Sequence, residues 1–269
     1  MDYETFFDQV HDRRGSNAAK WQAFDADVLP MWVADMDFPS PPGVITALQE
    51  RVAHGIFGYP GDNPALTEAI RAWLKMRFDW AVEHEWIVLL PGVVNGFNMA
   101  AHLLSAPQDG IVIQTPVYPP FLSTARLAGM RSVEMQLTSD PNGYYTIDLE
   151  RFKSAIAQNA GMFLLCNPHN PVGRVFTRDE LLGMATCCLE HDTIIVSDEI
   201  HADLVFPTQR HLPIASLDPQ IAKRTITLMA PSKTFNIAGL ECAFAVIPDP
   251  ELRQRYQRAG KGLVGWVNL

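Results

Sequence analysis

The chain has 269 residues, 48% of them hydrophobic and 19% charged, which is typical of a globular protein with one large core or two domains. Its 30 acidic and 21 basic residues give a formal net charge of −9, which argues against nucleic acid and anionic membrane surfaces as partners. The polar N-terminus lacks the apolar core of a signal peptide, and no apolar run is long enough to span a membrane, so we expect a cytoplasmic protein.

Residues 31–42 form an extended stretch that ends in prolines at 39, 41 and 42, so we expect an N-terminal arm over 1–40 and one domain over 41–269. In that domain several segments carry helix signals, such as proline in the first turn or the capping pair Thr177 and Glu180. The predicted helices are residues 43–54, 64–77, 94–104, 119–128, 149–157 and 178–191.

Short apolar runs rich in β-branched residues alternate with these helices, which predicts an α/β fold. Most of the runs lack polar alternation, as expected for strands that helices cover on both faces. We expect three layers, with one mainly parallel, seven-stranded sheet between the helices. The predicted strands are residues 86–90, 110–115, 132–137, 162–166, 193–197, 225–229 and 242–247.

The sequence after Pro250 begins a helix and then ends at GLVGWVNL, without a capping signal or a charged terminus. We therefore expect the domain to be incomplete at its C-terminal end. The four cysteines are Cys166, Cys187, Cys188 and Cys242. They form no CxxC pair and have no regular spacing, so we expect neither a metal site nor a disulfide framework.

Three polar residues follow predicted strands, at the edge where open α/β sheets bind ligands. Lys233 follows a buried strand, where an amine is costly unless it is paired or used, and its amine can form a Schiff base with pyridoxal 5′-phosphate (PLP). Asp198 suits the PLP ring nitrogen, which needs a carboxylate, and Asn170 suits its phenolate oxygen. Singly these would be a surface lysine, an N-cap and a turn residue; together they predict a PLP site.

The motifs Asn-Pro-x-Asn-Pro-x-Gly, Ser-Asp-Glu-Ile-His and Ser-Lys-Thr-Phe-Asn, in this order, resemble those of fold-type-I PLP enzymes of the class I/II aminotransferase superfamily. Three more blocks resemble the cystathionine β-lyase (C–S lyase) branch: RRGSNAAKW from residue 13, MWVADMDF from residue 31, and Gly58-Tyr59-Pro60. The resemblance extends over the chain from residue 13. It implies a PLP-dependent carbon–sulfur lyase that converts cystathionine or related cysteine conjugates to a thiol, pyruvate and ammonia.

The resemblance also implies how the PLP ring would be held. Lys233 would carry the cofactor covalently and, once released, move the substrate's α-proton. Asp198 would pair with the ring nitrogen and Tyr118 would stack on the ring face. Asn170 and His201 would contact the ring oxygen, His201 in the place where other family members have a tyrosine.

The cofactor phosphate would bind to backbone N–H groups of Val93 and Val94 at the start of a helix, since helix N-termini favour anions. Ser232 is a further phosphate ligand in this scheme. Tyr59 would reach the phosphate from a neighbouring subunit, which implies a homodimer.

Val33 and Ala34 would line the substrate pocket near its carboxylate. The sequence departs from the family pattern at Ala230 and Glu241, where family members have a serine and an arginine on the phosphate. No residue matches the arginine that binds the substrate carboxylate, which family members carry in a small C-terminal domain that we expect to be absent. Two alternatives to the lyase stay open: an aminotransferase, which shares these residues, and a truncated non-catalytic or regulatory PLP-binding protein.

Overall fold

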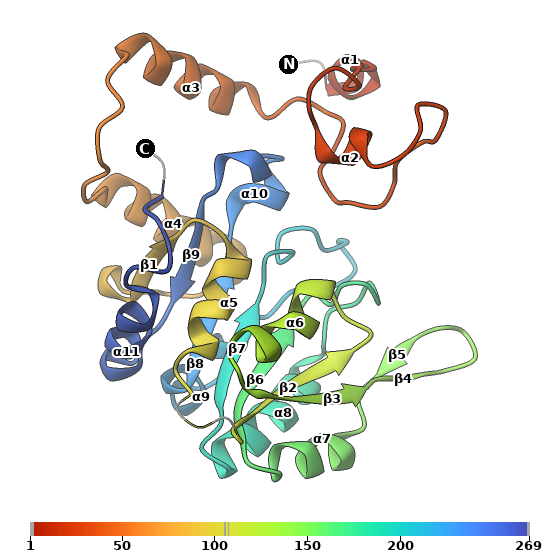
Figure 1. Cartoon of the computed structure of the whole chain (residues 1–269), viewed down its shortest axis with the longest axis vertical. Coiled ribbons are helices and arrows are strands. Elements are labelled where there is room, and N and C mark those ends of the chain that lie inside the picture. Colours follow the sequence, from red (N-terminus) through yellow and green to blue (C-terminus); the bar gives the residue numbers. More distant parts are fainter. Residues whose placement is uncertain (1–2, 105, 107, 268–269) are drawn as a thin grey trace.

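The computed structural model describes residues 3–104, 106 and 108–267. Its main sheet has seven strands: β1 (Ile87–Leu90), β2 (Gly110–Thr115), β3 (Arg131–Gln136), β6 (Ala160–Cys166), β7 (Ile194–Asp198), β8 (Thr225–Met229) and β9 (Ala243–Val246). They lie in the order β1-β9-β8-β7-β6-β2-β3 (Figure 1). β9 is antiparallel to β1 and β8, and the other neighbouring pairs are parallel. The predicted α/β fold with a mainly parallel, seven-stranded sheet is confirmed.

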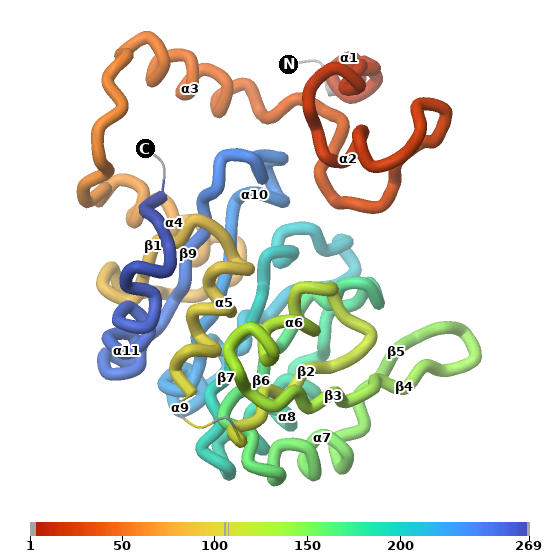
Figure 2. Tube along the Cα trace, viewed as in Figure 1, coloured from red at the N-terminus to blue at the C-terminus, as the bar shows by residue number. Residues whose placement is uncertain are grey.

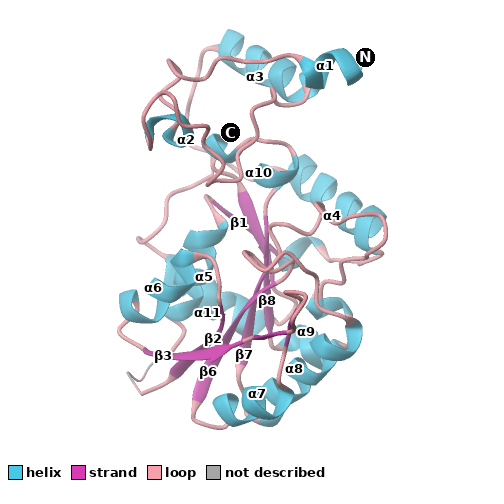
Figure 3. Cartoon of the chain, turned by 90° about the vertical axis from the view of Figure 1, so that its right-hand side faces the viewer, coloured by secondary structure: helices cyan, strands magenta, loops and turns pink. Residues whose placement is uncertain are grey.

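Helices cover both faces of the sheet (Figure 3). On one face lie α5 (Val93–Ala101), α6 (Pro119–Leu127) and α11 (Pro250–Gly260). On the other lie α4 (Pro64–Phe78), α7 (Leu149–Ile156), α8 (Arg178–Glu190) and α9 (Pro219–Lys223). Buried side chains of the two faces form separate hydrophobic clusters against these helices. The three predicted layers are therefore present.

Burial explains why the strands were predictable. Every residue of β7, β8 and β9 is buried, as the continuous apolar runs indicate. β3 lies at the sheet edge and alternates between exposed and more buried residues. At the start of α8, Thr177 and Glu180 form the predicted capping box.

The N-terminal segment and the turn that carries Lys233 lie at the same end of the sheet, beyond the carboxyl ends of the parallel strands (Figures 1 and 2). The segment contains α1 (Tyr3–Asp8), α2 (Ala19–Gln22) and α3 (Pro42–His54), and the turn contains α10 (Pro231–Thr234). Residues 31–41 are irregular as predicted, whereas α1 and α2 were not predicted. The domain boundary at residue 40 stays a prediction.

Smaller elements complete the chain. A hairpin of β4 (Thr138–Ser139) and β5 (Tyr145–Thr146) encloses a turn at Asn142 and Gly143, and 3₁₀ turns occur at η1 (His84–Trp86), η2 (Ile214–Ser216) and η3 (Ala238–Leu240). Among the described residues, none of the helices combines the length and the apolar character that crossing a membrane requires.

Candidate active site

Lys233 lies in α10, a short helix that begins directly after β8. β8 is buried along its length. The chain leaves the carboxyl end of this strand at Ala230, the N-cap of α10, and Pro231 is the first residue of the helix. Two backbone hydrogen bonds close this turn, from Phe235 N to Pro231 O (2.9 Å) and from Ile237 N to Ser232 O (3.0 Å). Residues 230–237 are named here the Lys233 turn.

Asp198 ends β7, the strand beside β8, and only 5% of the residue is exposed. Its Oδ1 accepts a hydrogen bond from Ile200 N (3.1 Å). Burial raises the pKa of Asp198 to about 7, with the Glu199 charge acting in the same direction, while the Ile200 hydrogen bond and the Lys233 charge oppose it. Asp198 ends β7 and Lys233 follows the neighbouring strand β8, so both residues lie at the same edge of the sheet.

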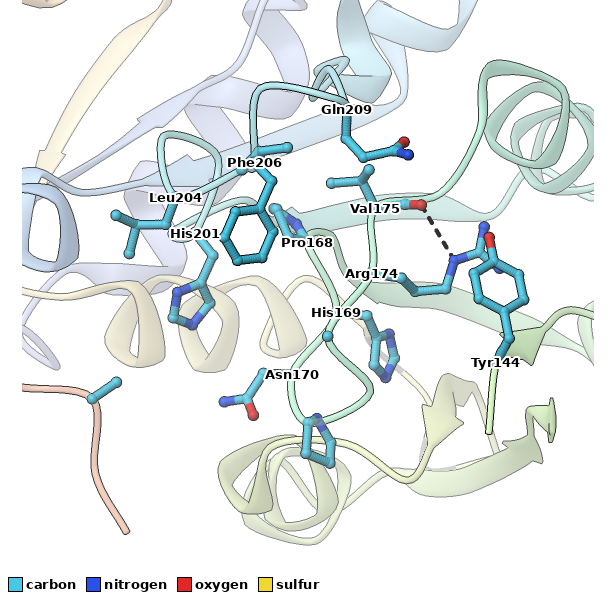
Figure 4. A pocket seen from close by; sticks show the side chains of 14 residues that line it. Tyr144, Pro168, His169, Asn170, Arg174, Val175, His201, Leu204, Phe206 and Gln209 are labelled. Carbon is cyan, nitrogen blue, oxygen red and sulfur yellow. Dashed lines mark hydrogen bonds between the residues drawn. The ribbon is translucent and has the colours of Figure 1, made fainter. Parts of the chain in front are cut away.

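His201 and Asn170 line a cavity of about 480 Å³. Figure 4 shows both side chains on the same side of that cavity, on the loops that follow β7 and β6. Burial lowers the pKa of His201, and the nearby charge of Lys233 lowers it further, so the imidazole is neutral at neutral pH. The cavity thus has two uncharged groups able to donate hydrogen bonds, and Lys233 is not among the residues that line it.

The Asn170 loop is fixed by its backbone. Asn170 N donates to Cys166 Sγ (3.4 Å), and Asn170 O accepts a hydrogen bond from Tyr118 N (3.0 Å). Tyr118 is the N-cap residue of α6 and is 39% exposed, so this bond brings the end of β2 to the loop that follows β6. The structure therefore places Tyr118 next to Asn170, as the predicted ring contact requires.

Arg174 also lines this cavity, but its guanidinium group is already used. It forms an ion pair with Glu180, donates to Tyr145 O (2.5 Å) and, through Nε, to Val175 O (3.2 Å; dashed in Figure 4). These bonds leave Arg174 a structural residue of the loop. The structure thus gives no reason to assign it the missing carboxylate-binding role.

The N-terminus of α5 has the features of an anion site. Its N-cap, Gly92, contributes no side-chain cap, so the N–H groups of Val93 and Val94 in the first turn have no partner within the helix. A Cβ atom on Gly92 would lie 2.9 Å from Asn95 Oδ1, so a larger residue there would require the Asn95 side chain to move. These N–H groups suit a phosphate. Ser232 lies in the Lys233 turn, and no described contact joins it to α5.

The remaining predicted residues divide into two sets. Ala34 lines the cavity that His201 and Asn170 line, and Val33 precedes it with a partly buried side chain. Tyr59 has 86% of its surface exposed, and its ring packs edge-on against Trp266, with centroids 5.2 Å apart. No described contact brings Tyr59 to Lys233 within the chain.

Sequence reasoning missed Asp203 as a site residue. Its Oδ2 accepts hydrogen bonds from Trp73 Nε1 (3.1 Å) and Thr234 Oγ1 (3.0 Å), and its Oδ1 accepts one from Arg77 Nε (3.0 Å). Asp203 thereby links the turn after His201 to α4 and to the residue next to Lys233. Nothing in the sequence around Asp203 names these partners.

The groups at this edge fit PLP: an amine, a buried carboxyl beside it, two neutral donors facing a cavity and an uncapped helix N-terminus. Residues 26–264 match the family model "Aminotransferase class I and II". The chain belongs to this family. The sequence-based recognition of the superfamily is confirmed.

Relatives of this class I/II family member carry lyase names. This chain is 41% identical over 266 residues to the cystathionine β-lyase PatB of Bacillus subtilis, and the match covers 95% of this chain and 68% of PatB. The crystal structure of cystalysin from Treponema denticola, which contains PLP, superposes with a TM-score of 0.92 at 34% identity, covering 97% of this chain and 68% of cystalysin. The crystal structure of a PLP-bound C–S lyase from Staphylococcus hominis superposes with a TM-score of 0.88 at 33% identity. The match covers 94% of this chain and 65% of the lyase. The chain thus spans about two thirds of each relative.

Proposed function

We propose that the protein is a PLP-dependent carbon–sulfur lyase that acts on cystathionine or related cysteine conjugates. The observation that carries this proposal is that buried Asp198 and Lys233 lie at the ends of the neighbouring strands β7 and β8, in a chain 41% identical to a cystathionine β-lyase. The products are a thiol, pyruvate and ammonia.

PLP, when bound, supplies an electron sink for the substrate Cα. Lys233 would hold the cofactor and, when its amine is free, would be the base that removes the Cα proton. The Cβ–S bond then breaks, the sulfur leaves with the bonding electrons as a thiolate, and water releases the remaining three carbons and the nitrogen as pyruvate and ammonia. Asp198 keeps the ring nitrogen charged because a cation opposite a buried carboxylate stabilises both charges.

His201 and Asn170 orient the cofactor without changing its charge. Both line the same cavity, and the lowered pKa of His201 keeps its imidazole neutral with one N–H to donate. Val93 and Val94 hold the phosphate through backbone N–H groups, which carry no formal charge. This neutral donor set is consistent with Ala230 and Glu241 at positions where family members bind the phosphate with side chains.

Replacing the lysine tests the assignment. Lys233→Ala removes the amine that holds the cofactor and moves the proton, so we expect at least a thousandfold loss of pyruvate formation, on the order of general-base and covalent contributions together. The visible absorbance of the bound cofactor is expected to change in the same variant. Pyruvate release from cystathionine, with no keto acid added, is the measurement.

Lys153→Ala is the matched control, since Lys153 is an exposed lysine on α7, on the other side of the sheet from α5. It should retain wild-type absorbance and turnover. Full lyase activity in Lys233→Ala would remove the basis of the proposal.

The second candidate is an aminotransferase, which the description of the matching family favours. It would use Lys233, Asp198 and Asn170 in the same places, and it differs in returning the proton to the cofactor instead of expelling sulfur. Turnover that requires a keto acid and yields a new amino acid supports this candidate. Pyruvate and thiol released without an acceptor support the lyase.

Two further properties belong to the proposal. Tyr59 is exposed and has no described contact with Lys233, and no residue of α3 is buried although Ile45, Leu48 and Val52 are apolar. A homodimer would cover this surface and give Tyr59 a neighbouring site to reach. A cytoplasmic location agrees with four cysteines that are all free thiols.

A further inference from the structure

The N-terminal arm is held together by its own charges around two aspartates. Arg13 donates to Asp35 and to Asp37 (2.7 Å each), and Lys20 Nζ and Trp21 Nε1 donate to Asp37 (2.7 and 2.9 Å). Burial opposes ionisation of Asp37, but hydrogen bonds from Lys20, Trp21 and Arg13 lower its pKa to about 2. Only 8% of Lys20 is exposed. The backbone between the two aspartates is therefore a fixed part of the arm.

That fixed backbone is bound by Asn236. Asn236 Oδ1 accepts a hydrogen bond from Met36 N (2.9 Å), and Nδ2 donates to Met36 O (3.1 Å) and Phe38 O (2.7 Å). Ser40 Oγ donates to Asn236 O (3.0 Å). One amide side chain thus satisfies three backbone groups of a segment about 200 positions away in the sequence.

Asn236 is itself rigidly placed relative to Lys233. It belongs to the Lys233 turn, three residues after the lysine, and has a left-handed φ of 53°, a conformation that asparagine adopts more readily than most residues. On the other side of the turn, Thr234 is bonded to Asp203 and the Phe235 ring packs on Trp73, with centroids 5.5 Å apart. The turn therefore cannot shift towards or away from the arm without breaking these contacts.

The arm contributes one residue to the lining of the cavity. Ala34 lies two residues before Met36 and lines the cavity together with His201 and Asn170. Since Asn236 bonds to Met36 on both its N–H and its C=O, the position of Asn236 sets how far the Ala34 wall lies from Lys233.

We propose that Asn236 is a positioning residue that couples the N-terminal arm to the Lys233 turn and thereby sets the affinity for the amino-acid substrate. It does not touch the reacting atoms, so it acts on binding and leaves the proton transfer by Lys233 unchanged. The inference rests on the proposed function only in placing an amino acid in this cavity.

Asn236→Gly is the first test variant, because glycine accepts the left-handed φ and only the side-chain bonds are lost. Hydrogen exchange at the Met36 amide, measured on the complete protein loaded with PLP, reports the bond directly, and we expect it to become about tenfold faster. Binding of L-alanine, which has no leaving group at Cβ, is followed through the cofactor absorbance, and we expect its affinity to fall about tenfold. In the lyase assay KM should rise while kcat stays within about twofold.

Asn159→Gly is the control, since Asn159 also has a left-handed φ (61°) and a side-chain bond to Asp109 (3.3 Å), just before β6 at the opposite end of the sheet. It should change neither measurement. Asn236→Asp keeps the size and the acceptor but loses the donor, and it should reproduce the result if Asn236→Gly does not fold.

Unchanged Met36 exchange in Asn236→Gly would overturn the proposal. So would faster exchange with unchanged L-alanine affinity, because the arm would then be held without affecting the pocket. A loss of L-alanine affinity with faster exchange supports the proposal even if the wild-type protein releases no pyruvate, so the failure of the lyase assignment is seen separately.

Discussion

Burial of the Asp198 carboxylate lowers the stability of the cofactor-free folded protein, and the charge of Lys233 offsets this cost only in part. Its folded pKa is about 7 against 3.8 for an unperturbed aspartate, chiefly because of burial. The folded state therefore binds the proton more tightly than the unfolded chain does. Stability should fall as pH rises from about 4 towards 7, and stay low above pH 7.

Asp198→Asn removes this cost. In the cofactor-free protein we expect the variant to be more stable than the wild type by about 2–4 kcal/mol at pH 8, and equally stable near pH 4. Urea unfolding at the two pH values measures the difference. Affinity for PLP should fall, because the carboxylate opposite the ring nitrogen is lost.

Asp62→Asn makes the same change at an exposed position between α3 and α4. Its stability should differ from wild type by less than about 0.5 kcal/mol at both pH values. If the free energy of unfolding changes with pH in the same way in Asp198→Asn and in wild type, the folded state does not raise the pKa of Asp198.

The residues at the strand ends were predictable from the sequence. The residues that hold the Lys233 turn in place through side-chain hydrogen bonds were not. Lys233, Asp198 and Asn170 follow buried runs, so their common edge follows from the parallel sheet. Asp203 and Asn236 act through partners in α4 and in the arm, at distances of 130 and 200 positions. No local pattern specifies such partners, since they depend on how the finished elements pack.

At the scale of elements, periodicity and capping predicted the seven strands of the main sheet to within two residues at each end. The helix expected over residues 94–104 ends at Ala101, and α1 and α2 were missed. The arm is organised by ion pairs around Asp35 and Asp37, not by a hydrophobic stripe. Hydrophobic periodicity therefore carries little information about it.

The contact between α5 and the sheet allows a test of the phosphate site. A Cβ atom on Gly96 would lie 2.8 Å from Leu228 and 3.0 Å from Leu90, and Gly96 O accepts a hydrogen bond from Tyr256 Oη (3.0 Å). Gly96→Ala should push α5 off the sheet and displace its N-terminus. We expect about 1–3 kcal/mol lower stability and weaker PLP binding, measured by denaturant unfolding and by fluorescence titration with PLP.

Gly43→Ala is the helical control, because a Cβ atom there has no atom within 4 Å. It should leave PLP binding unchanged. Equal PLP affinity in Gly96→Ala and wild type would show that the phosphate does not bind at the N-terminus of α5.

At the scale of the whole molecule, the exposed apolar side chains of α3 predict a second chain. Light scattering should give twice the chain mass of 30.0 kDa for the protein as described. Leu48→Glu places a charge among the apolar side chains and should shift the particle to one chain. Gln49→Glu, an exposed neighbour on the same helix, should remain a dimer. A wild-type monomer at every concentration would contradict the homodimer.

The antiparallel strand β9 has a consequence for how the protein is made. β1 pairs with β9 alone, and β9 begins at Ala243, more than 150 positions after β1 ends. A nascent chain that has emerged from the ribosome up to β8 still lacks the partner of β1, the strand from which α5 follows. The PLP site can therefore be completed only after β9 has been made, and shorter intermediates leave an unpaired strand edge for chaperones to shield.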